Sequence, residues 1–142
     1  MGRFKLSTRV QHLNESATLR MAQMARELSN RQIDVINLSL GEPDFDTPMH
    51  IKEKAKEAID SGNTKYTPVA GTLALRQAIS DKFKRDNQLN YSTDEIIVSN
   101  GAKQSFANLC NAMLDNPLDE VVLLAPYWVS YYEIIRLAGG TP

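Results

Sequence analysis

DEIIVSNGAKQSFANLCNAML, residues 94–114, predicts a strand, a tight turn and a helix in direct succession. The β-branched run 96–98 is typical of a short strand, and Asn100-Gly101 is a turn signal. After the turn, apolar residues recur at the spacing of one helix face: Ala102, Phe106, Leu109, Cys110 and Met113. This order of elements is the repeating unit of α/β domains.

The turn in this stretch has the chemistry of an anion site. The first backbone N–H groups of a helix have no partner inside the helix, and the positive end of the helix dipole lies there. A phosphate binds well at such a place. Gly101 would let the backbone approach the anion closely, and Lys103 adds a donor or a nearby charge. The alternative interpretation is an ordinary connection between a strand and a helix.

The chain on the amino-terminal side of this stretch reads as an arm, a helix, a strand and a loop. Residues 1–14 show no clear period. One apolar helix face then follows, with Asn14 or Ser16 available as N-cap: Met21, Met24, Ala25 and Leu28. Residues 34–40 predict a strand, and residues 41–48, GEPDFDTP, predict a loop. A glycine at the end of a strand, here Gly41, can offer its N–H to a ligand, although the loop could equally be a plain connector.

Three further helices and one further strand are predicted. Thr47, a capping hydroxyl, followed by Pro48 at the first helical position predicts a helix start, and Gly62 predicts its end. The apolar stripe between them is Ile51, Ala55, Ala58 and Ile59. A loop over 63–71 carries Tyr66, which could pack beneath the loop or reach a phosphate or a partner subunit, and the next helix has the stripe Leu75, Ala78, Ile79 and Phe83. Asn116-Pro117 predicts the end of the central helix, and 120–125 a buried strand. A last helical stripe, Tyr131, Ile134, Ile135 and Ala138, stops at Gly139-Gly140, and another strand should begin at Pro142.

The ends of the predicted strands indicate one ligand-binding side. In an open α/β sheet, ligands bind beyond the carboxyl ends of the strands. Both Trp128, just after the strand at 120–125, and the Asn100-Gly101 turn fall on that side. A phosphate seat beside a tryptophan, together with the loop tyrosine Tyr66, suggests a phosphorylated planar ligand.

Composition narrows the class of protein. The net charge is −1, from 16 basic and 17 acidic residues that are well mixed, which argues against nucleic acid or a membrane as the main partner. No apolar run reaches the length of a membrane span, and the start lacks the core of a signal peptide, so we expect a cytoplasmic location. Cys110 lies on an apolar helix face and is expected in the core. His12 and His50 have no partners at metal-ligand spacing, so we expect no metal site.

Four motifs in this order and spacing, LSLGEPDFDTP, TKYTPVAG, SNGAKQ and APYWVSY, resemble the amino-terminal third of the pyridoxal-phosphate aminotransferases of the aspartate aminotransferase class. The resemblance covers nearly the whole chain, and the four motifs together are highly specific. It implies an α/β chain with a partial PLP-dependent transferase fold, whose three-layer αβα large domain is incomplete and whose N-terminal helical arm belongs to the small domain. The implied division is 1–45 for the arm and first part of the small domain, and 46–142 for the truncated large domain.

The resemblance also implies roles for individual residues. Gly101, Ala102 and Lys103 would line the phosphate site of pyridoxal 5'-phosphate, and Trp128 would stack on its ring and touch the substrate. Tyr66 would reach the phosphate of the cofactor in the neighbouring subunit, so that a homodimer shares its active sites. Gly41 would meet the substrate carboxylate through its N–H.

The resemblance assigns no catalytic residue to this chain. The Schiff-base lysine, the acid that pairs with the pyridine nitrogen and the substrate arginine lie beyond residue 142 in this family, and Lys103 belongs to the phosphate turn. One local departure is Leu118 in NPLDE, where the family often has glycine. If that turn needs a positive φ, leucine would be strained there and the turn should differ in shape.

The first hypothesis is therefore the amino-terminal portion of an aminotransferase that moves an amino group between an amino acid such as aspartate and a 2-oxo acid, the isolated chain being inactive. An aromatic or prephenate-type aminotransferase is the nearest enzyme alternative. A second hypothesis is a non-catalytic, truncated module that folds by dimerising or by complementing another chain. A third, a nucleotide-binding α/β domain, lacks support because the chain has neither GxGxxG nor GxxxxGK[ST].

Overall fold

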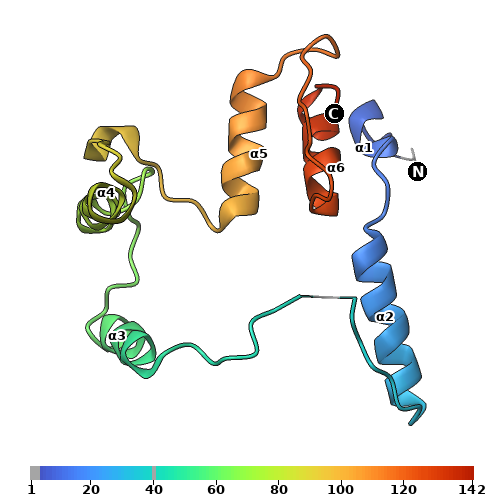
Figure 1. The fold of residues 1–142 in the computed structure, drawn as a ribbon, viewed down its shortest axis with the longest axis horizontal. Coiled ribbons are helices and arrows are strands. Elements are labelled where there is room, and N and C mark those ends of the chain that lie inside the picture. Colours follow the sequence, from blue (N-terminus) through green and yellow to red (C-terminus); the bar gives the residue numbers. More distant parts are fainter. Residues whose placement is uncertain (1–3, 40) are drawn as a thin grey trace. The chain divides into compact units, whose positions relative to one another are not determined.

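A computed structural model describes residues 4–39 and 41–142 of the chain. The described residues form a succession of helices joined by irregular segments (Figure 1). In chain order the helices are α1 (Thr8–Gln11), α2 (Ala17–Asn30), α3 (Met49–Asp60), α4 (Leu73–Asn87), the 3-10 helix η1 (Thr93–Glu95), α5 (Ala102–Met113) and α6 (Val129–Ala138). Each of the five segments in which the sequence shows a helical stripe of apolar residues is thus confirmed as a helix: α2, α3, α4, α5 and α6.

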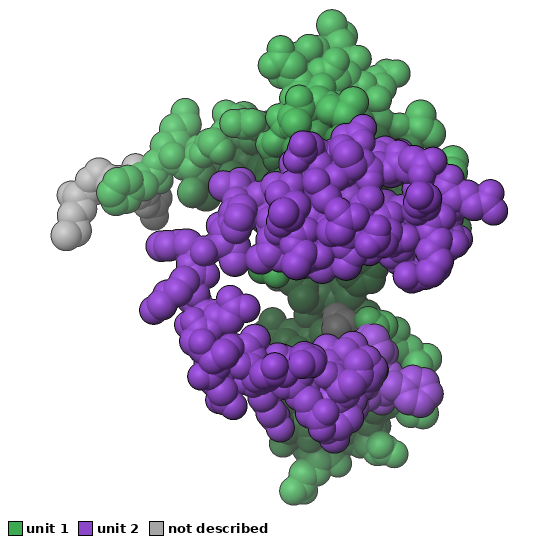
Figure 2. Space-filling view, turned by 90° about the vertical axis from the view of Figure 1, so that its left-hand side faces the viewer, with its two compact units in different colours: residues 1–41, 100–142 green, residues 42–99 purple. Residues whose placement is uncertain are grey.

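The chain divides into two compact units, which Figure 2 distinguishes by colour. The first unit comprises 1–41 and 100–142, and the second comprises 42–99. The division at residue 45 into parts of a small and a large domain stays a prediction.

The core of the first unit lies between α5 and α6, which run side by side in Figure 1. Three residues from these helices are buried: Cys110, Ile135 and Ala138. The rings of Phe106 and Tyr131 pack across the same interface with their centres 5.0 Å apart, a distance that favours aromatic attraction. Part of each apolar stripe read from the sequence therefore faces the other helix, whereas Leu109 and Met113 of the α5 stripe are 53% and 70% exposed.

The segment between α5 and α6 has the alternation of a strand. Val121 and Leu123 pack against the core cluster, whereas Val122 and Leu124 are 86% and 83% exposed. A side-chain period of two is the signature of extended backbone. Both faces of this segment are apolar, and only one of them is covered by described residues of the chain.

Beyond α6 the chain returns beside the start of this extended segment. Glu120 and Thr141 form a parallel β-bridge, in which the N–H of Val121 donates to the carbonyl of Thr141 at 2.9 Å. A parallel pair joined by a helical crossover is the βαβ arrangement of α/β proteins. The strand expected to begin at Pro142 is represented in the described residues only by this isolated bridge at Thr141.

The prediction of three complete strands, at 34–40, 96–98 and 120–125, was wrong for the described residues. They contain one isolated bridge and no strand, and Leu40 lies outside them. Ile96 nevertheless has extended dihedral angles (φ −119°, ψ 125°) and is buried, while the next residue, Ile97, is 71% exposed. The backbone has strand geometry, but a strand also needs a ladder of hydrogen bonds to a neighbouring segment. In the described residues this run makes one such bond, from the N–H of Val98 to the carbonyl of Ala70 at 3.0 Å.

Helix α2 begins as the sequence predicts. The hydroxyl of Ser16, its N-cap, accepts a hydrogen bond from the N–H of Leu19 at 3.4 Å, and Ala22 is buried. Ser16 rather than Asn14 is therefore the cap. The segment that precedes it contains the short helix α1, which contacts α6. Of the predicted arm, residues 1–14, the part from residue 4 onward is described, and residues 1–3 lie outside the described residues.

The second unit contains α3, α4 and η1. The guanidinium of Arg76 on α4 donates to the carbonyl of Thr93 at 2.7 Å, which joins α4 to η1. Helix α3 ends before Gly62, whose φ of 74° is the left-handed conformation expected of a helix-ending glycine. The predicted cap at Thr47 was wrong: Pro48 is the N-cap and no side chain caps α3.

The predicted end of the central helix at Asn116-Pro117 was also wrong, because α5 already ends at Met113. The turn that follows is closed by Asp119, whose carboxylate accepts hydrogen bonds from the N–H groups of Asp115 (2.7 Å) and Asn116 (3.1 Å). Leu118 is not among the described non-glycine residues that have positive φ, which are Gln32 and Gln88. Leucine is therefore accommodated here without left-handed strain.

Candidate functional site

The amino end of α5 is open in the way that an anion site requires. Gly101, the N-cap, has φ 87° and ψ 163°, a conformation that is essentially restricted to glycine. Its carbonyl accepts hydrogen bonds from the N–H groups of Gln104 and Ser105, and within the described chain the N–H groups of Ala102 and Lys103 have no acceptor. Two unpaired donors thus lie at the positive end of the helix dipole.

Gly101 also leaves room for a ligand. A Cβ atom built on this glycine would meet no heavy atom within 4 Å. Lys103, in the first turn of the helix, is exposed. Two free N–H groups and an ammonium group are donors of the kind that bind phosphate, and the open space beside them would admit it.

Trp128 lies at the same end of the helix pair. It is the N-cap of α6 and is 42% exposed. The ammonium nitrogen of Lys103 is 5.7 Å from the centre of the Trp128 ring, within the range of a cation–π interaction. The structure therefore brings together two of the residues predicted for the site, although they are 25 positions apart in the sequence.

Gly41 and Tyr66 were also predicted for the site. Gly41 belongs to the first unit, is exposed, and has no heavy atom within 4 Å of the position of a Cβ. Tyr66 belongs to the second unit, and its side chain is fully exposed, at 106%. Their predicted roles, in binding the substrate carboxylate and a neighbouring subunit's cofactor, stay predictions.

One residue of the turn was missed from the sequence. The side-chain oxygen of Gln104 accepts a hydrogen bond from the N–H of Asn100, which fixes the backbone just before Gly101. A glutamine three residues after an N-cap commonly reaches back to the N–H of the N-cap, and here it reaches one residue further, to Asn100, so the spacing Gly101 to Gln104 was the available signal.

Cys110 is a core residue rather than a nucleophile. It is 4% exposed, and its burial raises the pKa of the thiol, which disfavours the reactive thiolate. Residues 4–39 and 41–142 hold no group of three or more His, Cys, Asp or Glu side chains that could bind a metal ion. No helix in these same ranges is both long enough and apolar enough to cross a membrane.

The chain belongs to the class I and II aminotransferases. The model of the family Aminotransferase class I and II matches residues 33–142, which is most of the chain. The match covers the Gly101 turn and Trp128. The resemblance seen in the four sequence motifs is thereby confirmed.

Individual relatives agree with this assignment. The chain is 53% identical over 138 residues to the aspartate/prephenate aminotransferase of Nitrosomonas europaea, a match that covers 97% of the chain and 34% of that relative. It is 50% identical over 135 residues to the aspartate/prephenate aminotransferase of Thermus thermophilus, with 95% and 35% covered.

Solved structures agree as well. Aspartate aminotransferase from Thermus thermophilus with maleate superposes with a TM-score of 0.92 at 48% identity, over 98% of this chain and 36% of that one. Alanine aminotransferase from Pyrococcus furiosus superposes with a TM-score of 0.90 at 31% identity, over 97% and 35%. The chain thus spans about a third of the length of its relatives and has a partial aminotransferase fold, as predicted.

Proposed function

We propose that this chain is the amino-terminal portion of a pyridoxal-phosphate-dependent aminotransferase, which moves an amino group between an amino acid and a 2-oxo acid. The observation that carries the proposal is the open amino end of α5 beside Trp128. It occurs in a chain that is 53% identical over 138 residues to an aspartate/prephenate aminotransferase. The proposed cofactor is pyridoxal 5'-phosphate.

The proposed phosphate site consists of Gly101, Ala102 and Lys103. The free N–H groups of Ala102 and Lys103 would donate to phosphate oxygens, and the open space beside Gly101 would admit them. The contact between Lys103 and Trp128 does not compete strongly, because an exposed cation–π pair contributes roughly 0.5–1 kcal/mol. A hydrogen bond to a charged group contributes about 1.5–3 kcal/mol, so the ammonium group would favour the phosphate.

The proposed role of Trp128 is to orient the cofactor ring by stacking against it. When bound, such a cofactor supplies an electron-accepting ring that stabilises negative charge developing on the substrate's α-carbon. Trp128 would hold the ring plane and exclude water from one of its faces. No residue of this chain is assigned the proton transfer, and Lys103 binds rather than acts as the catalytic lysine.

Gly41 and Tyr66 complete the proposal. The N–H of Gly41 would bind the substrate carboxylate, and the exposed phenol of Tyr66 would reach the cofactor phosphate of a second subunit. The proposed assembly is accordingly a homodimer with shared active sites. A cytoplasmic location stays a prediction of the sequence.

Aspartate is the proposed amino donor. It is supported by the names of the relatives above, which also mention prephenate. Prephenate, already part of the alternative drawn from the sequence, is therefore a second candidate for the keto substrate beside 2-oxoglutarate. Alanine is named for a relative of lower identity, 31%.

The proposal is tested with the protein expressed from its own gene. Its intact mass comes first, because a mass near the 15.9 kDa of this sequence would mean that any activity needs a second chain. Pyridoxal phosphate is then added, followed by aspartate with 2-oxoglutarate or with prephenate. Bound-cofactor absorbance and consumption of aspartate are expected, whereas cofactor binding without amino transfer to either acceptor would contradict the proposed activity.

A further inference from the structure

Residues 7–16 lie along α6. Their hydrogen bonds to this helix involve neither the turn at Gly101 nor the packed rings of Phe106 and Tyr131. Arg9 donates from its guanidinium to the carbonyl of Leu137 at 3.5 Å, near the end of α6. Five residues further along, the side-chain amide of Asn14 donates to Glu133 at 2.9 Å, one turn earlier in α6. The segment therefore runs antiparallel to α6, and we call residues 7–16 the strap.

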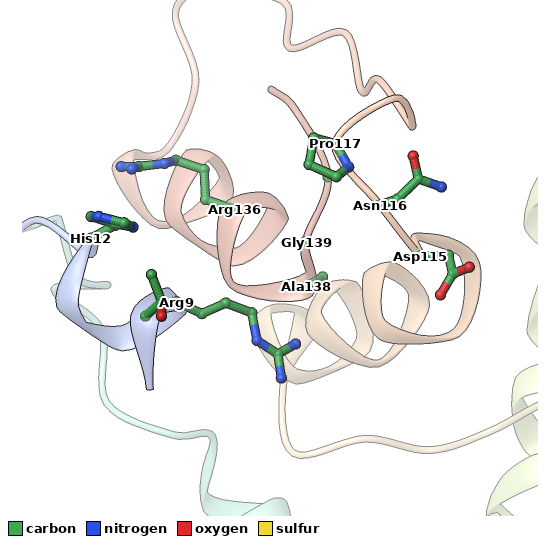
Figure 3. Close-up of a pocket in the computed structure, with 10 residues that line it drawn as sticks. Arg9, His12, Asp115, Asn116, Pro117, Arg136, Ala138 and Gly139 are labelled. Carbon is green, nitrogen blue, oxygen red and sulfur yellow. The ribbon is translucent and has the colours of Figure 1, made fainter. Parts of the chain in front are cut away.

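The first contact of the strap lies at the carboxyl end of α6. Figure 3 shows Arg9 extending from α1 toward Ala138 at the end of that helix. A cavity of about 500 Å³ opens here between the strap and the end of α6. A cation near helix-terminal carbonyls is favourable, so Arg9 compensates the negative end of the dipole. Since Arg9 donates to Leu137 and Arg136 pairs with Glu133 at 3.5 Å, this cavity does not offer two free cations to an anion.

The second contact lies at the middle of α6, where Glu133 is the fifth of ten residues. Glu133 accepts from Asn14 with one carboxylate oxygen and faces Arg136 with the other. A smaller cavity, of about 280 Å³, lies between residues 14–17 and the first turn of α6. Trp128 immediately precedes that turn. The strap thus ends beside the part of α6 that carries the proposed ring-stacking residue.

The strap is held by few contacts. Helix α1 has no buried residue, Leu13 is only half-buried, and both hydrogen bonds from the strap to α6 are made by exposed side chains, those of Arg9 and Asn14. Segments with few buried apolar contacts and exposed hydrogen bonds open at low free energy. The hydrogen bond from Asn14 to Glu133 is charge-assisted and is the shorter of the two.

We propose that the strap is a reversible clamp on α6, latched by Asn14 and Glu133, and that its opening changes the position of Trp128. Asn14 and Glu133 are positioning residues, which act on the site through the first turn of α6. The consequence for cofactor binding rests on the role proposed for Trp128. The clamp itself can be tested without cofactor or substrate, so that its failure and the failure of the proposed function are distinguishable.

The test uses the protein expressed from its own gene, in the Asn14→Asp variant. Two carboxylates then face each other, and the latch should open. Tryptic cleavage after Arg9 should become about fivefold faster, because cleavage follows the population of the open strap. The Trp128 contribution to the fluorescence, obtained by subtracting the spectrum of a Trp128→Phe variant, should shift in wavelength.

A swapped pair provides the rescue. In the double variant Asn14→Asp with Glu133→Gln, the amide and the carboxylate exchange places, and the hydrogen bond can form in the opposite direction. Cleavage and Trp128 emission should both return toward those of the unmodified protein. Glu15→Ala, a charge change at the neighbouring exposed position, is the matched control and should alter neither.

Two results would overturn the proposal. Cleavage that is equally fast in the swapped pair and in Asn14→Asp would show that this hydrogen bond does not latch the strap. Faster cleavage with unchanged Trp128 emission would show that the strap opens without reaching the site.

Discussion

The ammonium group of Lys103 lies 5.7 Å from the centre of the Trp128 ring, and this contact joins the first turn of α5 to the N-cap of α6. A βαβ arrangement places the amino ends of successive crossover helices at the same edge of a parallel sheet. A phosphate seat and a flat aromatic ring therefore become neighbours through topology alone. The predictions for the site follow from this relationship.

Lys103→Ala should weaken the binding of pyridoxal phosphate. Loss of one charge-assisted hydrogen bond corresponds to a dissociation constant that is about 10- to 100-fold higher. The variant should still turn over at saturating cofactor, because Lys103 binds and does not transfer the proton. Cofactor titration of the protein expressed from its own gene measures the change.

Lys82→Ala is the matched control for this variant. Lys82 also lies over an aromatic ring, that of Phe83, at 5.8 Å, and it is on α4 rather than at the amino end of α5. Its removal should leave the cofactor affinity unchanged. Complete loss of activity in Lys103→Ala under saturating cofactor would show that the assigned role is incorrect.

Trp128→Ala should lower both cofactor affinity and turnover, because the ring would lose its stacking partner and its fixed plane. Trp128→Phe keeps a smaller ring and should lose less of each. The control is Tyr132→Ala, which removes an aromatic side chain of comparable exposure, 38%, one turn further along the same helix. Kinetics of Trp128→Ala that equal those of the unmodified protein would remove Trp128 from the site.

The helices could be predicted from the sequence because their signals are local. An amphipathic spacing and a cap such as Ser16 lie within a few residues of each other, so α2 and α5 were found from the sequence alone. Extended segments differ, because a strand exists only with a partner. The run 120–125 was predicted as a buried strand, yet Val122 and Leu124 are exposed in the described structure, and its partner among the described residues is limited to the bridge at Thr141.

The contact that joins the strap to α6 could not be predicted from any short stretch of sequence. Asn14 and Glu133 are 119 positions apart, and both are polar residues of ordinary type. Periodicity reports which face of an element is buried, but it does not report which exposed side chains meet. The family resemblance placed Lys103 and Trp128 in one site, whereas the strap had no equivalent pattern.

Gly101→Ala should weaken phosphate binding and destabilise the protein. With φ 87° and ψ 163°, an alanine here would cost of order 1–3 kcal/mol or change the turn that presents the N–H groups. The added methyl meets no neighbour within 4 Å, so any effect is conformational rather than steric. Calorimetric titration with pyridoxal phosphate and denaturant unfolding measure the two effects, and an unchanged affinity would contradict the proposed seat.

Gly140→Ala should destabilise the first unit through overpacking. A Cβ there would lie 2.9 Å from the side chain of Leu114 and 3.0 Å from the carbonyl of Asp119. Overpacking of this kind typically costs about 1–3 kcal/mol. Gly41→Ala is the matched control for stability, because its Cβ would meet nothing within 4 Å. Equal unfolding midpoints for the two variants would show that residue 140 is not tightly packed.

Asp119→Ala should lower stability in a way that depends on pH. The N–H groups of Asp115 and then Asn116 donate to the Asp119 carboxylate, and they hold its pKa below the usual value for aspartate. A group whose pKa is lowered on folding stabilises the native state above its unfolded pKa, and this stabilisation is lost as the pH falls through the lower, folded value. The stability difference between the unmodified protein and Asp119→Ala should therefore be full at neutral pH and shrink below about pH 4.

The matched variant for that experiment is Asp119→Asn. Its side-chain oxygen can still accept a hydrogen bond from the N–H groups of Asp115 and Asn116 but carries no charge, so it should recover part of the stability without the pH dependence. Urea unfolding of all three proteins at neutral and acid pH separates the two contributions. A gap between the unmodified protein and Asp119→Ala that stays constant down to acid pH would mean that the ionised carboxylate does not hold the turn, and that the conformation around Leu118 is fixed by the backbone alone.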